Sequence, residues 1–410
     1  MESIGEIYRV GHGPSSSHTM GPSRAAAQFL ARHPDAAAFT VALYGSLAAT
    51  GRGHLTDRVL LDTLGPERTE LQWHPEVELP RHANGMTFTA RDGAGASLES
   101  WTTYSVGGGA LRDDATWDSP RPRVYPLSSM DEILAWAEGS GGALWEYVEL
   151  HEGPEIWPLL AEIWTVMDDA IDRGLEAEGR LPGTLGLGRK AASYFVKASN
   201  ASDFSREMGR VFAYALAVAE DNACGGSVVT APTCGSSGVL PAVLRFLQET
   251  HHCSNRRILR ALATAGLVGN LVKANASVSG AEVGCQGEIG TACAMAAAAA
   301  AQLMGGSVDQ VEFAAENGME HHLGLTCDPV EGYVQIPCIE RNAAAAGRAL
   351  QTAAFAVFSD GRHRISFDEV VTTMKQTGAD MNTDYKETSR AGLAKYWQDS
   401  EQKKRGQVPE

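Results

Sequence analysis

The chain is organised around the stretch Glu282-Val-Gly-Cys-Gln-Gly-Glu-Ile-Gly290. Its glycines interrupt a region that is otherwise typical of helices, and residues 293–304, which follow almost at once, are nearly all alanine. Alanine has the highest intrinsic helix propensity and a very small side chain, so this run predicts a buried helix packed closely against its neighbours. The stretch therefore predicts a loop that leads into a core helix.

Three cysteines lie in such breaks. Cys285 belongs to the stretch above, Cys327 lies in Gly324-Leu-Thr-Cys-Asp-Pro-Val-Glu-Gly332, and Cys338 lies in Gln335-Ile-Pro-Cys-Ile-Glu-Arg341. Breaks of this kind free backbone N–H groups and let a bulky ligand approach closely. Three thiolates from separate loops would suit a metal cluster with one position open for substrate. Spacing alone leaves two alternatives open, namely core cysteines or a structural zinc site completed by His321 or His322.

Composition limits the classes of function. With 410 residues, the chain is long enough for two domains with substantial cores. A formal net charge of −16 and a pI near 5.2 argue against a surface for nucleic acid or for anionic membranes. No apolar run is long enough to span a membrane and the first residues do not resemble a signal peptide, so we expect a cytoplasmic protein. Seven cysteines, an odd number, argue against a disulfide framework.

The sequence predicts an α+β fold with four parts. These are a small N-terminal α/β domain, a linker with three prolines, a large all-helical domain and a polar tail, in residues 1–115, 116–127, 128–400 and 401–410. Four strands are predicted in the small domain, in residues 39–45, 70–79, 86–91 and 97–106. Residues 24–31 predict a helix capped by Ser23. Residues 11–23 are too rich in glycine, proline and serine to predict a regular element.

Apolar residues at helical spacing predict the large domain, most clearly in residues 156–175. Similar patterns cover residues 204–222, 239–249, 258–272 and 341–358. Glycine-rich interruptions separate these segments, so the economical prediction is a domain whose helix ends converge on one site. One interruption, residues 225–238, is typical of an anion-binding loop before a helix, although it matches neither the P-loop nor the Rossmann fingerprint.

Two histidines of the small domain, His18 and His54, lie in glycine-rich loops beside hydroxyl side chains. The hydroxyl residues next to His18 are Ser15, Ser16, Ser17 and Thr19. Hydroxyl groups near free backbone N–H groups can hold a carboxylate, and histidine can move protons near neutral pH. The simpler alternative is that this segment is a tight turn and helix cap without a chemical role.

Taken together, these motifs resemble the iron–sulfur-dependent L-serine dehydratases (L-serine ammonia-lyases) in their single-chain form. The resembling stretches run in order across nearly the whole chain, at residues 13–22, 51–57, 104–109, 231–238, 282–290 and 327–342. Several are long and free of gaps, which makes the resemblance highly specific. It implies a small α/β domain followed by a large all-helical domain that holds an iron–sulfur cluster, and assembly as a homodimer.

The resemblance also implies roles for particular residues. A [4Fe–4S] cluster with one iron not bound by cysteine would be held by Cys285, Cys327 and Cys338. His18 and His54 would be the catalytic histidines that face it, and the sequence does not decide which accepts and which donates a proton. The substrate would be L-serine, converted to pyruvate and ammonia, with Ser15, Ser16, Ser17 and Thr19 as candidates for binding it.

One feature departs from part of that family. Some single-chain relatives end in a cysteine that folds back onto the open iron and inhibits the enzyme. The printed sequence has no cysteine after Cys338, so we expect no such inhibition here.

The residues alone allow other interpretations. Pyridoxal phosphate is the usual alternative electron sink for this reaction, and it needs a Schiff-base lysine. The lysines of the central stretch are Lys190, Lys197 and Lys273. A zinc-dependent hydrolase, or a serine sensor without catalysis, would use the same loops differently.

Overall fold

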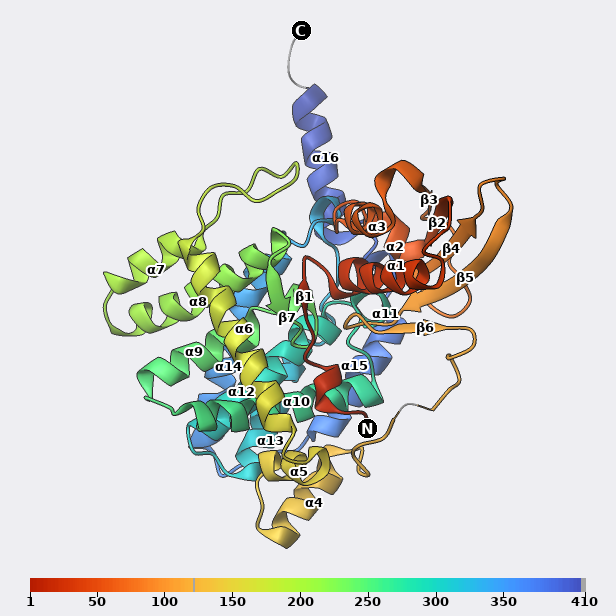
Figure 1. Cartoon of the computed structure of the whole chain (residues 1–410). Helices are drawn as coiled ribbons and strands as arrows, with labels where there is room; N and C mark the ends of the chain where they lie inside the picture. Colours follow the sequence, from red (N-terminus) through yellow and green to blue (C-terminus); the bar gives the residue numbers. More distant parts are fainter. Residues whose placement is uncertain (121, 407–410) are drawn as a thin grey trace.

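The computed structural model of this protein describes residues 1–120 and 122–406. It confirms a mixed α+β fold, in which a small five-stranded sheet from the N-terminal part lies beside a large helical body. Figure 1 shows the sheet at the upper right and the helical body at the centre and left. The predicted order of a small α/β part followed by a helical part is therefore correct.

The sheet has the strand order β3-β2-β4-β5-β6. The strands are β2 (Ala38–Tyr44), β3 (Thr69–His74), β4 (Gly85–Arg91), β5 (Ser97–Ser105) and β6 (Leu111–Asp113). Strands β2 and β3 run parallel, and the other neighbours run antiparallel. Val41 of β2 pairs with Phe88 of β4, and both are buried against the helices α1 (Gly21–Arg32) and α3 (Thr56–Leu64). The four predicted strands are confirmed, although β3 ends at His74 instead of residue 79.

The segment before α1 is more regular than its composition predicted. Val10–His12 form β1, and Ser16–Met20 form a π-helical turn that continues directly into α1. Helix α1 therefore begins at Gly21, and the prediction that Ser23 caps it is wrong. A serine cap does occur, but on the π-helical turn before α1: the Ser15 Oγ accepts a hydrogen bond from the His18 N–H at 3.1 Å. A serine cap at this earlier position lets the helical turns start sooner than the glycines and prolines suggested.

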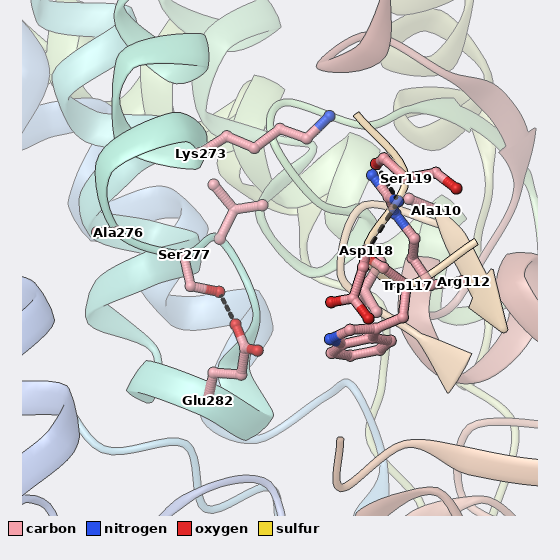
Figure 2. Close-up of a pocket in the computed structure, with 11 residues that line it drawn as sticks. Ala110, Arg112, Trp117, Asp118, Ser119, Lys273, Ala276, Ser277 and Glu282 are labelled. Atoms are coloured by element: carbon pink, nitrogen blue, oxygen red, sulfur yellow. Dashed lines mark hydrogen bonds between the residues drawn. The ribbon is translucent and has the colours of Figure 1, made fainter. Parts of the chain in front are cut away.

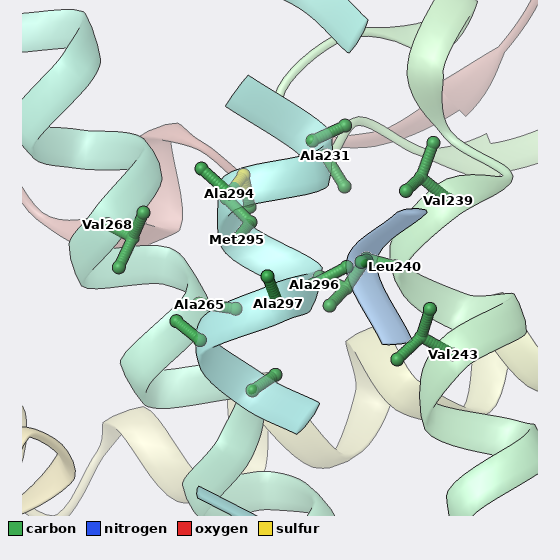
Figure 3. Close-up of a cluster of buried hydrophobic side chains, with 14 of the residues drawn as sticks. Ala231, Val239, Leu240, Val243, Ala265, Val268, Ala294, Met295, Ala296 and Ala297 are labelled. Atoms are coloured by element: carbon green, nitrogen blue, oxygen red, sulfur yellow. The ribbon is translucent and has the colours of Figure 1, made fainter. Parts of the chain in front are cut away.

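The helical body is built around α12 (Thr291–Leu303), which is buried along almost its whole length. It packs against α9 (Val239–Thr250), α10 (Asn255–Asn275), α13 (Val308–Glu320) and α14 (Cys338–Phe358). Figure 3 shows Ala294, Ala296 and Ala297 of α12 among valine, leucine and alanine side chains of α9 and α10. Because alanine projects only one carbon from the backbone, neighbouring helices can approach α12 closely. The predicted alanine-rich core helix is confirmed.

The other helices surround this core, and the predicted helical segments all fall within them. The remaining helices are α2 (Gly45–Thr50), α4 (Met130–Ser140), α5 (Leu144–Glu152), α6 (Ile156–Glu176), α7 (Ala191–Ser199), α8 (Asp203–Ala223), α11 (Gly280–Val283), α15 (Phe367–Asp380) and α16 (Gly392–Gly406). Within the described residues, no helix is both long enough and apolar enough to cross a bilayer.

The first residues of the chain belong to the helical body in space. Strand β1 pairs antiparallel with β7 (Ser227–Val229), and Ile4, Ile7 and Tyr8 are buried in the core of the helical body. The chain then crosses to the sheet and returns after β6 through residues 114–120 and 122–129, which contain neither a helix nor a strand. The predicted domain limits stay a prediction.

The predicted polar tail, residues 401–410, begins inside a helix. Helix α16 continues to Gly406 and projects away from the body in Figure 1. Residues 407–410 lie outside the described part of the chain.

The crossing of α6 and α8 provides a test of this packing. A Cβ atom on Gly174 of α6 would lie 2.7 Å from the Cα of Ala217 in α8, and still closer to its carbonyl group. We expect Gly174→Ala to lower the free energy of unfolding by about 1–3 kcal/mol, because backbone cannot move aside as a side chain can. Urea unfolding followed by circular dichroism measures the change.

The control is Gly139→Ala in α4, where no atom lies within 4 Å of the added Cβ. It should leave stability unchanged or raise it by up to about 1 kcal/mol, since alanine favours the helix. Equal effects of the two substitutions would contradict the close crossing of α6 and α8.

Candidate functional site

A small cavity lies where loops of the helical body meet the histidine-bearing loops of the N-terminal part. Cys285, Cys327, Cys338 and His54 all line it. The structure therefore brings together the three predicted cysteines and one of the two predicted histidines. None of the seven cysteines forms a disulfide.

Each cysteine is positioned either by the end of a helix or by a loop that is hydrogen-bonded to another segment. Cys285 immediately precedes the π-helical turn Gln286–Gly290, which runs into α12. Cys338 is the first residue of α14, where the helix dipole favours a thiolate. Cys327 lies in the loop between α13 and α14 and makes two backbone hydrogen bonds with the segment between α15 and α16. The packing of α12 against α14 thus brings Cys285 and Cys338 to the same cavity.

The three thiols share an environment that disfavours their ionisation unless a cation is present. Burial raises the pKa of the Cys285 thiol to about 11, and the Arg341 guanidinium limits this rise. Burial also raises the pKa of Cys327 and of Cys338 well above the ordinary value, and the neighbouring thiols contribute to both shifts. Thiolates so placed would repel one another, whereas a metal centre bound to all three would stabilise them. These three cysteines could therefore hold a metal cluster.

The two histidines stack on each other at the edge of this cavity. Their ring centroids are 4.5 Å apart, with an interplanar angle of 25°. His54 lines the cavity, whereas His18, which is fully buried, does not. Burial lowers the pKa of His54 to about 4 and lowers the pKa of His18 well below its ordinary value. Both rings are therefore neutral at pH 7, and a neutral imidazole can accept a proton.

Hydroxyl groups and carbonyl groups hold the histidine loops in place. The Thr19 hydroxyl donates a hydrogen bond to the His54 carbonyl at 2.7 Å, and the Thr56 hydroxyl donates one to the His18 carbonyl at 2.5 Å. The His54 Nδ1 lies 2.9 Å from the Thr50 carbonyl oxygen. These contacts tie the loop before α1 to the loop before α3, so the two histidines are oriented as a unit.

The candidates for substrate binding divide into two groups. Ser15 lines the cavity, and its hydroxyl also caps the turn that carries His18. Thr19 is occupied with the His54 carbonyl, and Ser16 and Ser17 are buried in the same turn but are not among the residues that line the cavity. Ser15 is therefore the one of the four placed to meet a ligand there.

Two carboxyl groups that sequence analysis did not single out also line the cavity, those of Glu288 and Glu387. The Cys327 thiol points toward the Glu288 Oε2 at 3.8 Å. The Glu387 Oε1 lies 3.4 Å from the His18 Nδ1 and 3.6 Å from the His54 Nε2. Burial raises the pKa of both carboxyl groups, and Glu288 adds to the rise for Glu387. Glu288 lies in the stretch quoted first, but no spacing pattern connects Glu387 with the histidines.

The predicted anion-binding loop contributes Gly235 to the cavity wall. At the C-terminal end of this loop, a side chain of α14 takes up the backbone hydrogen bonds. The Gly238 N–H donates a hydrogen bond to the Asn342 Oδ1 at 2.9 Å, and the Asn342 Nδ2 donates one to the Gly235 carbonyl at 2.7 Å. Asn342 therefore fixes this loop against the helix that begins with Cys338.

The residues needed for a zinc site or for a Schiff base lie elsewhere. His321 is largely exposed and His322 faces the Gly318 carbonyl, and neither lines the cavity. Lys190 pairs with Glu340 on the surface and Lys273 pairs with Glu2. Lys197 lines a separate groove beside α7 and α8. None of these three lysines lines the cysteine cavity.

A second cavity, of about 420 Å³, lies between the sheet and the helical body (Figure 2). Its charged residues are Arg112, Asp118, Lys273 and Glu282. Figure 2 shows the hydrogen bond that the Ser277 hydroxyl donates to Glu282 on one wall. The residues that line this cavity include no cysteine and neither of the two stacked histidines.

Comparisons with known proteins cover nearly the whole chain. Residues 97–394 match the family described as serine dehydratase alpha chain, and residues 3–67 and 63–116 match the family described as serine dehydratase beta chain. The L-serine dehydratase of Streptomyces coelicolor is 43% identical over 96% of this chain and 98% of its own. L-serine dehydratase 1 of Escherichia coli is 41% identical over 96% and 99%, and the Haemophilus influenzae L-serine dehydratase is 38% identical over the same shares.

The low pKa of His54 predicts a pH-dependent contribution to stability. The unfolded ring titrates near 6.5 and the folded ring near 4, so unfolding takes up a proton between these values and stability falls as the pH falls through this window. The contribution is complete above pH 6.5. Between pH 7 and pH 5, His54→Gln should therefore lose about 2 kcal/mol less stability than the wild type loses.

Urea unfolding at both pH values measures this difference. His251→Gln, at an exposed position that does not line the cavity, is the control. A wild type and a His54→Gln variant that lose the same stability on acidification would contradict a neutral, buried His54.

Proposed function

Because the chain belongs to the serine dehydratase family, we propose that it is an L-serine dehydratase, which converts L-serine to pyruvate and ammonia. The observation that carries this proposal is the cavity where the two family regions meet. The beta-chain region supplies His54, and the alpha-chain region supplies Cys285, Cys327 and Cys338. A group that accepts protons and a set of metal ligands therefore face one enclosed space, as a water elimination requires.

We infer that the three cysteines hold a [4Fe–4S] cluster with one iron not bound by cysteine. The donor set fits, since three thiols from three loops face one cavity and their raised pKa values call for a positive centre. The Arg341 guanidinium, held by the Thr326 carbonyl at 2.7 Å, supplies a fixed positive charge beside them. When bound, the cluster would supply a Lewis-acidic iron for the β-hydroxyl group of serine.

The protein itself supplies the proton chemistry. His54 is neutral at pH 7 and lines the cavity, so its Nε2 can accept the α-proton of serine. His18 supports it by stacking from behind, and Thr50 and Thr19 hold the His54 ring and backbone. The product 2-aminoacrylate then tautomerises and hydrolyses in water to pyruvate and ammonia.

Further properties expected from the sequence extend this proposal. L-Serine is the small-molecule substrate, bound near Ser15 and Gly235, whose positions in the wall support contact with its carboxylate. Assembly as a homodimer and a cytoplasmic location stay predictions. No nucleic-acid or membrane partner is proposed.

Replacing one cysteine tests both the cofactor and the activity. After anaerobic reconstitution, the wild type should contain about four iron atoms per chain and release pyruvate from L-serine. Cys285→Ala should lose iron and should lose at least about 100-fold in turnover, because one of three protein ligands is gone. Pyruvate release is measured with L-serine, D-serine, L-threonine and L-cysteine, together with iron content.

Cys293→Ala is the matched control, because Cys293 is equally buried but lies within α12, away from the cavity wall. It should retain both iron and turnover. Unchanged pyruvate release by Cys285→Ala would end the cluster assignment. An aldimine absorbance band would point to pyridoxal phosphate instead, and stoichiometric zinc in freshly isolated protein would point to a hydrolase.

A further inference from the structure

The side chain of Gln286, the residue after Cys285, is fully buried and makes three hydrogen bonds to backbone groups. Its Nε2 donates one to the Val283 carbonyl at 2.8 Å and one to the Met374 carbonyl at 3.2 Å. Its Oε1 accepts one from the Gly324 N–H at 2.9 Å. The amide group of a single side chain therefore connects three segments of the chain.

Two of these segments carry predicted metal ligands. Gln286 itself adjoins Cys285, and Gly324 lies shortly before Cys327 in the loop between α13 and α14. A backbone contact strengthens the connection, because the Gln286 N–H donates a hydrogen bond to the Leu325 carbonyl at 3.1 Å. The two cysteine segments are thus joined by hydrogen bonds in both directions.

The third segment is α15, which gives this connection a fixed support. Met374 is fully buried within α15. A Cβ atom on Gly378 of the same helix would lie only 2.7 Å from the Cβ of Val283, so α15 also contacts the segment before Cys285 closely. The residues after α15 hold Cys327 through the two backbone hydrogen bonds described above. Both cysteines are therefore held relative to the same helix.

Cys338 is held in a different way. It is the first residue of α14, and Arg341 of the same helix donates a hydrogen bond from its Nη1 to the Thr326 carbonyl at 2.7 Å. This contact reaches the neighbouring cysteine loop without involving Gln286. The hydrogen bonds of the Gln286 amide therefore concern Cys285 and Cys327.

The chemistry of the amide group explains why a glutamine suits this position. A side-chain amide can accept from one backbone N–H and donate to two carbonyls at once, and in a buried environment such bonds restrict motion strongly. A nonpolar side chain of the same length would form none of them, so the two cysteine segments would be free to separate. Groups that orient metal ligands in this way typically change metal affinity by about 10–100-fold.

We propose that Gln286 is a positioning residue that holds Cys285 and Cys327 for a shared metal centre and so determines how firmly that centre is retained. The inference rests on the proposed function, in which the cysteines hold an iron–sulfur cluster. Gln286 is not among the residues that line the cavity, so it acts through the two cysteines and not on the substrate.

Replacing the amide tests this role. Gln286→Met keeps an unbranched side chain of similar length and removes the three hydrogen bonds. After anaerobic reconstitution, an excess of an iron chelator should remove iron from this variant at least about tenfold faster than from the wild type. The loss of the visible absorbance of the cluster measures this rate. Turnover of L-serine per bound iron should stay near the wild-type value, because no group of the cavity wall is removed.

The iron-free protein provides a second readout that needs no metal. Labelling with iodoacetamide, followed by peptide mass spectrometry, measures how often each buried thiol becomes accessible. In Gln286→Met, Cys285 and Cys327 should be labelled about tenfold faster than in the wild type, because hydrogen bonds that keep their segments closed are lost. Cys293, which is buried within α12, should be labelled at the same rate in both proteins.

Gln310 is the matched control, because its side chain makes the same set of hydrogen bonds elsewhere. Its Oε1 accepts one from the Ser307 N–H at 2.8 Å, and its Nε2 donates to the carbonyls of Val357 and Ser359 at 3.1 and 2.8 Å. It does not line the cavity. Gln310→Met should lower the urea midpoint as Gln286→Met does, but it should leave iron release and cysteine labelling at the wild-type rates.

A milder variant covers the case in which Gln286→Met does not fold. Gln286→Asn keeps the amide group on a side chain one methylene shorter, which cannot reach all three partners. It should change iron release and labelling in the same direction and to a smaller extent.

The outcomes distinguish this inference from the proposed function. Wild-type iron release and labelling in the folded Gln286 variant, or equal changes in Gln310→Met, would overturn the role of Gln286 and leave the proposed function intact. An iron-loaded wild type without pyruvate release would overturn the proposed function and leave this role intact. A wild type that takes up no iron would overturn the cluster and the role of Gln286 together.

Discussion

The site depends on the pair of backbone hydrogen bonds between Cys327 and the segment that follows α15. These bonds join the loop of a predicted metal ligand to Tyr385 and Glu387, and the Ser46 hydroxyl extends the connection to the N-terminal part. The backbone of Glu387 is in the left-handed region, which is unfavourable for a residue other than glycine, and these hydrogen bonds stabilise it there. One short segment therefore closes the cavity and supplies one of its polar groups.

Burial is the second constraint, because it decides the charge of every group in the cavity. It lowers the pKa of both histidines and raises the pKa of the thiols and of the two carboxyl groups, so each group is shifted toward its neutral form. Enclosure from water therefore favours the uncharged form of each of these groups.

The fold was predictable where a repeated pattern covers many residues. Apolar residues at helical spacing predicted α6, because a helix with one buried face repeats its apolar residues about every 3.6 positions. The alanine run predicted α12, because a helix that is apolar on all sides is buried on all sides. Prediction failed at residues 11–23, where a serine cap and a π-helical turn replace the expected irregular loop. The outcome there depended on one side-chain hydrogen bond, which composition does not reveal.

By itself, the sequence determined the α+β organisation, the alanine-rich core helix and, through resemblance, the cysteines and histidines that line or border one cavity. Only the tertiary structure decided that His54 lines this cavity while His18 stacks behind it, and that the Glu387 carboxyl group lies beside both rings. The reason is physical. Secondary structure follows from short-range periodicity, whereas the Ser46–Glu387 contact joins residues 341 positions apart and exists only once α2 and the segment before α16 have packed together.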